Sequence, residues 1–146
     1  MRVFGHGKLT RPEGCVVSKN DEVFVSNTIM SYPFRVFSEI VVFSTQGKFL
    51  RSFGGGWLVD PAGIALSRTE DVLICDTSTC RILAFRPDGT LLWTYHTDYT
   101  NARYIHEKAE EASVQQVSLR PQWICVGDDG KMYIAGDTSH ILVLAI

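Results

Sequence analysis

Asp76 and Arg81 are the residues whose types and spacing could most readily do chemistry. They stand at the two ends of a short loop, DTSTCR, with Cys75 and Cys80 beside them. A carboxylate facing a guanidinium across a loop could belong to a functional site, but the simpler interpretation is that the two brace a turn between neighbouring strands. A metal or reactive-thiol site would need further ligands near the cysteines. We therefore predict a structural turn.

No other group of side chains predicts catalysis or metal binding. The four histidines show no ligand spacing, and no nucleophile stands in a recognisable relation to a base. The glycines at residues 54 to 56 are not followed by a helix or by Lys-Ser or Lys-Thr, which a phosphate-binding loop requires. Because glycine tolerates positive φ, we predict a hinge between strands there. The sequence thus favours a protein that is not an enzyme and that holds no metal or cofactor.

The composition is that of an ordinary globular chain. It has 146 residues, of which 45% are hydrophobic and 21% charged, and its formal net charge is -2. A near-neutral chain lacks the strongly basic surface that would attract nucleic acids or anionic membranes. No apolar run is long enough to span a membrane, no secretory signal precedes the chain, and the four cysteines form no C-x-x-C pair. These features predict a cytoplasmic or otherwise intracellular protein.

A repeat covers almost the whole chain. The segment at residues 4 to 27 aligns without a gap with residues 53 to 76, and a third copy lies at residues 119 to 137. Each copy begins its first strand-like run at a proline. These prolines are Pro12, Pro61 and Pro121. Strand-like repeats of roughly 40–50 residues are typical of the blades of a β-propeller.

The alternation of apolar and polar residues within each copy predicts the fold class. Short strand-like runs separated by turn residues indicate an all-β fold, built from blades of four-stranded antiparallel sheet, with about three blades in the chain. Blade 1 is expected at about residues 12 to 56, blade 2 at about 61 to 97 and blade 3 at about 121 to 146. The third copy stops after its third strand, and residues 2 to 4 look like the outer strand that would complete it.

The second copy carries a pattern that resembles the NHL repeat. The matching residues are Phe53, Gly54, Pro61, Gly63, Ile64, Ala65, Asp76, Arg81, Ile82, Phe85 and Gly89. The first copy has Asn27 where the family usually has Asp, and the third keeps Asp137 but has Trp123 for the glycine. The resemblance implies a half or partial six-bladed propeller. It also implies turn roles for Asn27, Asp76, Arg81 and Asp137.

Two insertions interrupt the repeat and hold the candidate binding residues. Residues 28 to 39 replace a short loop, and residues 96 to 120 replace a short crossing and include the only plausible helix, at 107 to 116. Both should emerge on one side of the sheets, where loops on a rigid scaffold can specialise. The first could instead fold down and cover its own blade. The predicted partner face consists of Tyr32, Phe34, Arg35, Phe37, Tyr99, Arg103 and Tyr104.

The pattern favours a non-catalytic NHL-type scaffold that binds a protein or peptide through this loop face. One alternative is an RNA-binding module of the ubiquitin-ligase type, although the acidic second insertion and the near-neutral charge make nucleic acid an unfavoured partner. The other alternative is a degenerate enzyme of the lactonase or lyase type. A divalent ion bound on the propeller axis would be evidence for this alternative. No membrane partner is expected.

The number of blades is the unusual feature of the sequence. Propellers typically close with about 4–8 blades, so three blades indicate a fragment, an open arc or half of a ring. Two copies arranged head to tail could each lend residues 2 to 4 to the other's last blade, which predicts a homodimer that closes the propeller. The rival account is that the sequence is a fragment.

Overall fold

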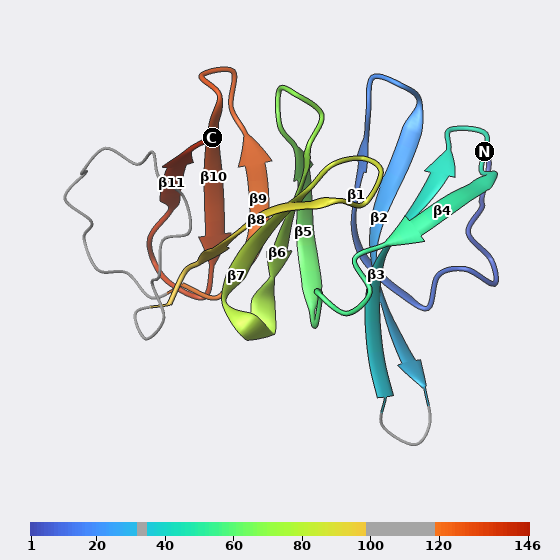
Figure 1. Ribbon diagram of the computed structural model, residues 1–146, viewed down its shortest axis with the longest axis horizontal. Coiled ribbons are helices and arrows are strands. Elements are labelled where there is room, and N and C mark those ends of the chain that lie inside the picture. Colours follow the sequence, from blue (N-terminus) through green and yellow to red (C-terminus); the bar gives the residue numbers. More distant parts are fainter. Residues whose placement is uncertain (32–34, 99–118) are drawn as a thin grey trace.

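The structure, a computed structural model, describes residues 1 to 31, 35 to 98 and 119 to 146 and places them in three antiparallel sheets (Figure 1). We call these sheets blades 1, 2 and 3. Blade 1 consists of β1 (Arg11–Val17), β2 (Glu22–Ser31), β3 (Arg35–Ser44) and β4 (Phe49–Phe53). Blade 2 consists of β5 (Pro61–Leu66), β6 (Val72–Asp76), β7 (Arg81–Phe85) and β8 (Leu91–His96). Blade 3 consists of β9 (Pro121–Val126), β10 (Lys131–Gly136) and β11 (Leu142–Ala145).

The predicted fold class is confirmed. Consecutive strands pair antiparallel in every blade, with four strands in blades 1 and 2 and three in blade 3. The described residues contain no α-helix, and their only helical element is the short 3-10 turn η1 (Thr77–Thr79). A helix that could cross a membrane is therefore absent from the part of the chain that the structure describes. The helix predicted at residues 107 to 116 lies outside that part.

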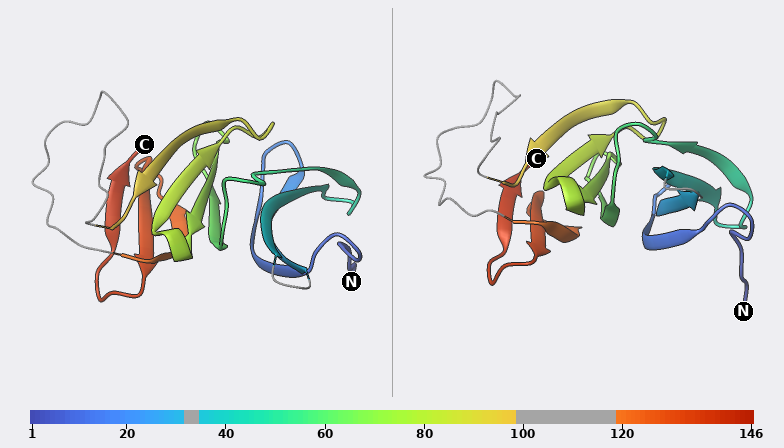
Figure 2. Two further views of the ribbon diagram at one scale, coloured as in Figure 1. Left: turned by 60° about the horizontal axis from the view of Figure 1, so that its bottom comes forward. Right: turned by 90° about the horizontal axis from the view of Figure 1, so that it is seen from below.

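The hydrophobic core lies between the blades, which stand side by side as an arc with β1, β5 and β9 on its inner side (Figure 2). One cluster joins blade 1 to blade 2 and another joins blade 2 to blade 3. Because blade 2 has a neighbour on each side, β6 is buried at every position. The residues at the centre of the first cluster are Phe24, Ile40, Val42, Ile74, Leu83 and Phe85.

Two glycines allow the inner strands to approach one another. A Cβ atom at Gly14 would lie 2.9 Å from the carbonyl oxygen of Ala62, and one at Gly63 would lie 2.5 Å from that of Gln122. Any larger residue would push the neighbouring inner strand away. The glycine two residues after Pro12 and after Pro61 is thus a packing requirement of the junction between blades.

One end of the sheets, toward the lower side of Figure 1, is the end that we call the loop face. The paired ends of β2 and β3, the β6–β7 turn and the β4–β5 crossing lie there. Strands β2 and β3 have 10 residues each, whereas β6 and β7 have 5. The β2–β3 hairpin therefore projects beyond the other blades, as an insertion on a loop face is expected to do.

Residues 2 to 4 form no strand within the single chain, where they have no ladder to join, and Phe4 packs against Phe43 with ring centroids 5.4 Å apart. The apolar runs that contain Cys15 and Cys125 predict that both side chains are buried, and this prediction is wrong, because both are exposed. Their ladder partners are Val25 and Tyr133, so both cysteines lie on faces that point away from blade 2, where no described blade covers them.

An ion pair within blade 1, between β2 and β4, also reaches blade 2 near the opposite end of the sheets. The guanidinium of Arg51 donates to both carboxylate oxygens of Glu22, at 2.7 and 2.8 Å, and to the carbonyl oxygen of Pro87 at 2.7 and 3.0 Å. Hydrogen bonding to Arg51 lowers the pKa of Glu22 below its ordinary value of 4.5, against the opposing effect of burial. Both side chains are less than one third exposed, so the pair is partly shielded from water.

Glu22→Gln should therefore reduce the free energy of unfolding by about 1 kcal/mol at neutral pH. Because the pKa of Glu22 is lowered in the folded state, the difference between wild type and variant is present above pH 4.5 and is lost as the pH falls through the folded pKa. Urea unfolding of both proteins across this pH range measures it. The exposed Asp128→Asn is the control, and an equal pH dependence in both variants would contradict the role of the pair.

Candidate binding face

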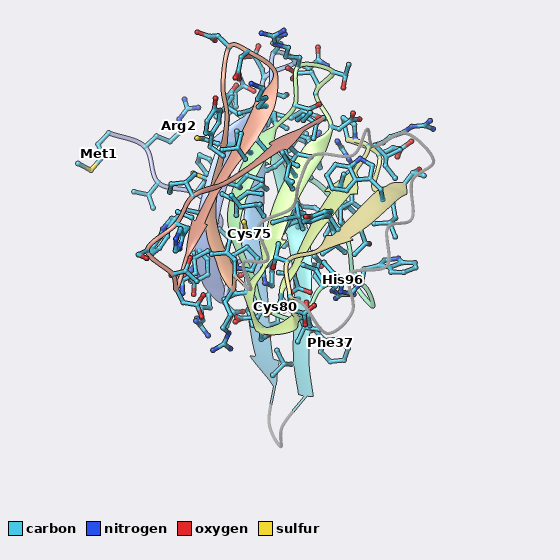
Figure 3. All side chains as sticks on the ribbon, turned by 90° about the vertical axis from the view of Figure 1, so that its left-hand side faces the viewer. Met1, Arg2, Phe37, Cys75, Cys80 and His96 are labelled. Atoms are coloured by element: carbon cyan, nitrogen blue, oxygen red, sulfur yellow. The ribbon has the colours of Figure 1, made fainter. Side chains whose placement is uncertain are left out.

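The predicted partner residues fall mostly on parts that the structure does not describe. Tyr32, Phe34, Tyr99, Arg103 and Tyr104 lie outside the described residues. Arg35 is the first residue of β3, and Phe37 follows it on the projecting hairpin with 53% of its surface exposed. Figure 3 shows Phe37 at the loop face, while Cys75 lies inside the stack of sheets.

The four predicted turn residues each contact the segment that leads into the first strand of a blade. Asn27 Oδ1 accepts hydrogen bonds from the amides of Thr10 and Arg11, at 2.9 and 3.2 Å. Asp137 Oδ1 accepts one from the amide of Arg120 at 2.8 Å. Asn27 lies in the second strand of its blade and Asp137 directly follows the second strand of its own. These residues therefore hold the segments that enter the blades.

Asp76 makes the most extensive of these contacts. Its carboxylate is completely buried, and Oδ1 accepts from the amides of Val59 and Asp60 at 3.1 and 2.6 Å. Oδ2 accepts from the hydroxyl of Thr79 at 2.5 Å and from Nη2 of Arg81 at 2.7 Å. A buried carboxylate requires such partners, since its desolvation is otherwise unfavourable. Oδ1 thus holds the backbone of the crossing and Oδ2 holds two side chains of the turn, so both oxygens have structural partners.

The crossing at residues 54 to 60 is held from several sides. Besides Asp76, Nη2 of Arg81 donates to the carbonyl oxygen of Trp57 at 2.9 Å. The hydroxyl of Ser38 on the hairpin donates to the carbonyl oxygen of Val59 at 2.7 Å. The backbone of this loop is therefore bound to blade 1 and blade 2 together, although it has no regular secondary structure.

This rigid loop presents two large apolar side chains that the sequence analysis missed. Trp57 is 53% exposed and Val59 is 47% exposed. The repeat contained the signal, because the aligned positions in the first copy hold Lys8 and Thr10. The fold therefore does not need apolar residues at these positions. We call Trp57, Val59 and the exposed hairpin residues Val36 and Phe37 the apolar group of the loop face.

A cleft lies beside this group, on the inner side of the arc. Its volume is about 390 Å³, and its polar lining includes Arg11, Glu13, Asp60, Thr77 and Gln122. Nε of Arg11 lies 2.7 Å from Oε1 of Glu13, so these two charges are paired. The cleft is open to solvent along the arc and could add polar contacts to a partner bound at the loop face.

The thiols near the turn do not have the properties of a nucleophile. Burial raises the pKa of Cys75 to about 12, so the thiol is protonated at neutral pH. Burial, together with the carboxylate of Asp98, also raises the pKa of Cys80. Within residues 1 to 31, 35 to 98 and 119 to 146, no three His, Cys, Asp or Glu side chains are grouped so that they could hold a metal ion.

Solved structures with similar folds share little sequence with the chain. A chain in the crystal structure of a nidogen/laminin complex matches with a TM-score of 0.67 and 14% identity, covering 97% of this chain and 45% of that one. A gluconolactonase from Xanthomonas campestris matches with a TM-score of 0.65 and 18% identity, covering 98% and 46%. A luciferin-regenerating enzyme matches with a TM-score of 0.63 and 11% identity, covering 96% and 44%. No protein-family model and no curated protein matches the sequence.

The radial arrangement of small antiparallel sheets, shared with these structures, decides the fold. It is a β-propeller. The chain spans less than half the length of these propeller chains. Its described residues form three blades. Because these propellers include both enzymes and a chain from a protein complex, the likeness concerns the propeller fold and carries no activity to this chain.

Replacing Asp76 tests its role in holding the crossing. Asp76→Ala removes all four hydrogen bonds and leaves Arg81 without its partner, so we expect a loss of about 3–5 kcal/mol in the free energy of unfolding. Asp76→Asn keeps an oxygen for the two loop amides, as Asn27 does in blade 1, and should cost about 1–3 kcal/mol. Denaturant unfolding measures both. The exposed Asp137→Ala, which removes one hydrogen bond from the amide of Arg120, is the control. Losses of equal size in all three variants would contradict this account.

Proposed function

We propose that this chain is a segment of an NHL-type propeller that serves as a non-catalytic scaffold and binds a protein or peptide at its loop face. The observation that carries the proposal is the apolar group of the loop face. Trp57 and Val59 are exposed on a loop whose backbone is hydrogen-bonded to two blades. Aromatic side chains on a rigid support are the residues that most often anchor protein interfaces.

The rigidity of the loop is what distinguishes this group from scattered exposed apolar residues. A side chain that is already positioned loses little conformational entropy when a partner binds, so more of its contact energy appears as affinity. The hairpin adds Val36, which lies on the same face of β3 as Ser38, whose hydroxyl donates to the loop, whereas Phe37 lies on the opposite face of β3. The cleft lined by Arg11, Glu13 and Asp60 offers polar contacts at the edge of the same surface. An apolar centre with a polar edge is the usual arrangement of an interface.

A random peptide library displayed on phage provides a probe that does not require the natural partner. Peptides selected on the wild-type chain should bind Trp57→Lys at least about tenfold more weakly, since truncating an anchoring Trp typically costs more than about 1.4 kcal/mol. Lysine is the residue that the first copy places at the aligned position, so the variant should fold. Binding of individual synthetic peptides, measured by fluorescence anisotropy, gives the ratio.

Leu50→Lys is the matched control, because Leu50 is 39% exposed on β4 and lies away from the loop face. Peptides that bind wild type and Leu50→Lys equally but lose affinity for Trp57→Lys support the proposal. A selection that yields no peptide, or peptides whose affinity does not change in Trp57→Lys, would count against a docking surface centred on this loop.

A further inference from the structure

The exposed large apolar side chains are concentrated at the two ends of the arc as well as at the loop face. Blade 2, as described at residues 61 to 98, exposes none. At the outer side of blade 1, the exposed residues are Val3, Phe4 and Val17, and at the outer side of blade 3 they are Trp123, Ile141 and Val143. Monomeric proteins rarely leave apolar faces of this kind open.

The open face of blade 3 has the composition of the face that joins blade 1 to blade 2. Pairing places Tyr133 opposite both Cys125 and Val143, so these three side chains point away from blade 2. The corresponding residues of blade 1 are Phe24, Val16 and Val42, which pack against blade 2. Blade 3 therefore presents an apolar surface of the kind that blade 1 buries against blade 2, and no described blade covers it.

The face of blade 1 that points away from blade 2 likewise matches the face of blade 2 that packs on blade 1. Val25 and Val41 stand where blade 2 has Ile74 and Leu83, and both are buried in a cluster against which Leu9 packs. The segment before β1 repeats the internal crossing: Phe4 contacts Phe43 at 5.4 Å between ring centroids, as Phe53 contacts Phe85 at 5.5 Å. Met1 and Arg2 extend away from the body beyond this contact (Figure 3). The face is thus prepared to receive the last blade of a preceding unit.

We propose that the occupant of both ends is a second copy of this chain, arranged head to tail, so that two arcs close one ring. The outer side of blade 3 of each copy packs on the outer side of blade 1 of the other, which gives two identical junctions related by two-fold symmetry. The two end faces complement each other, because blade 3 presents the kind of surface that blade 1 packs on blade 2, and blade 1 presents the kind of surface that receives it. The surface differs from the loop face, so this proposal stands apart from the proposed function.

Trp123 makes the junction between copies different from those within a copy. It occupies the position of Gly14 and Gly63, whose lack of a side chain lets the next inner strand approach closely. With 63% of its surface exposed, Trp123 would keep β1 of the second copy farther from β9 and fill the space between them with its indole ring. A buried Trp is a common anchor of an interface, so the wider junction still has a central contact.

The test compares one exposed valine at each end. Val143→Glu alters the blade 3 end and Val17→Glu the blade 1 end; the two residues are 44% and 55% exposed, so both variants should fold. Sedimentation equilibrium of the wild type at micromolar concentration should give twice the chain mass of 16.3 kDa. Each variant alone should be a monomer, because both of its junctions contain a buried glutamate. Val36→Glu, at the loop face with 52% exposure, is the matched control and should remain a dimer.

Mixing the two variants distinguishes head-to-tail packing from every other arrangement. An equimolar mixture of Val143→Glu and Val17→Glu can form one junction from two unaltered ends, so it should recover a heterodimer that neither variant forms alone. This recovery also shows that both variants are folded. A monomeric wild type, a dimer that only one of the two substitutions disrupts, a mixture that stays monomeric, or a mass that grows beyond two copies would each overturn the proposal.

Discussion

A buried carboxylate determines where the chain runs between the first two blades. Asp76 comes from the end of β6, yet its hydrogen bonds reach the crossing that precedes β5 as well as the turn that follows β6. In water-free surroundings the carboxylate is stable only while these donors stay in place. The position of the crossing is therefore set by polar contacts. Its outward side chains are left free of any structural task, which is why Trp57 and Val59 can be exposed there.

Apolar packing between blades imposes the second constraint. Blade 2 reaches complete burial of β6 because it has a neighbour on both sides, whereas the first and last blades each have one. Within the arc, Gly14 and Gly63 set how closely adjacent inner strands approach. The apolar packing at the internal junctions predicts that each end face also packs against an apolar surface. Trp123 stands where the other two copies have Gly14 and Gly63, so the inner strand of blade 3 cannot be approached as closely.

The repeat made the fold predictable from the sequence, because each copy carries both its strand pattern and the proline and glycine that position the inner strand. The same repeat contained the clue to Trp57, which differs from the aligned Lys8, but exposure depends on how the loop is held and not on residue type. The exposure of Cys15 and Cys125 could not be predicted from alternation alone, because it depends on whether another blade faces the inner strand. Likewise, residues 2 to 4 have a strand-like sequence, but a strand forms only where a partner ladder exists.

The central claim is that the crossing at residues 54 to 60 is a rigid part of the fold despite its lack of regular structure. Hydrogen exchange of the backbone amides, followed by NMR, tests this claim residue by residue. The amides of Val59 and Asp60 donate to the buried carboxylate of Asp76, so they should exchange as slowly as the amides of β6, through global unfolding. Exchange of these two amides at the rate of an open loop, while β6 stays protected, would contradict the account.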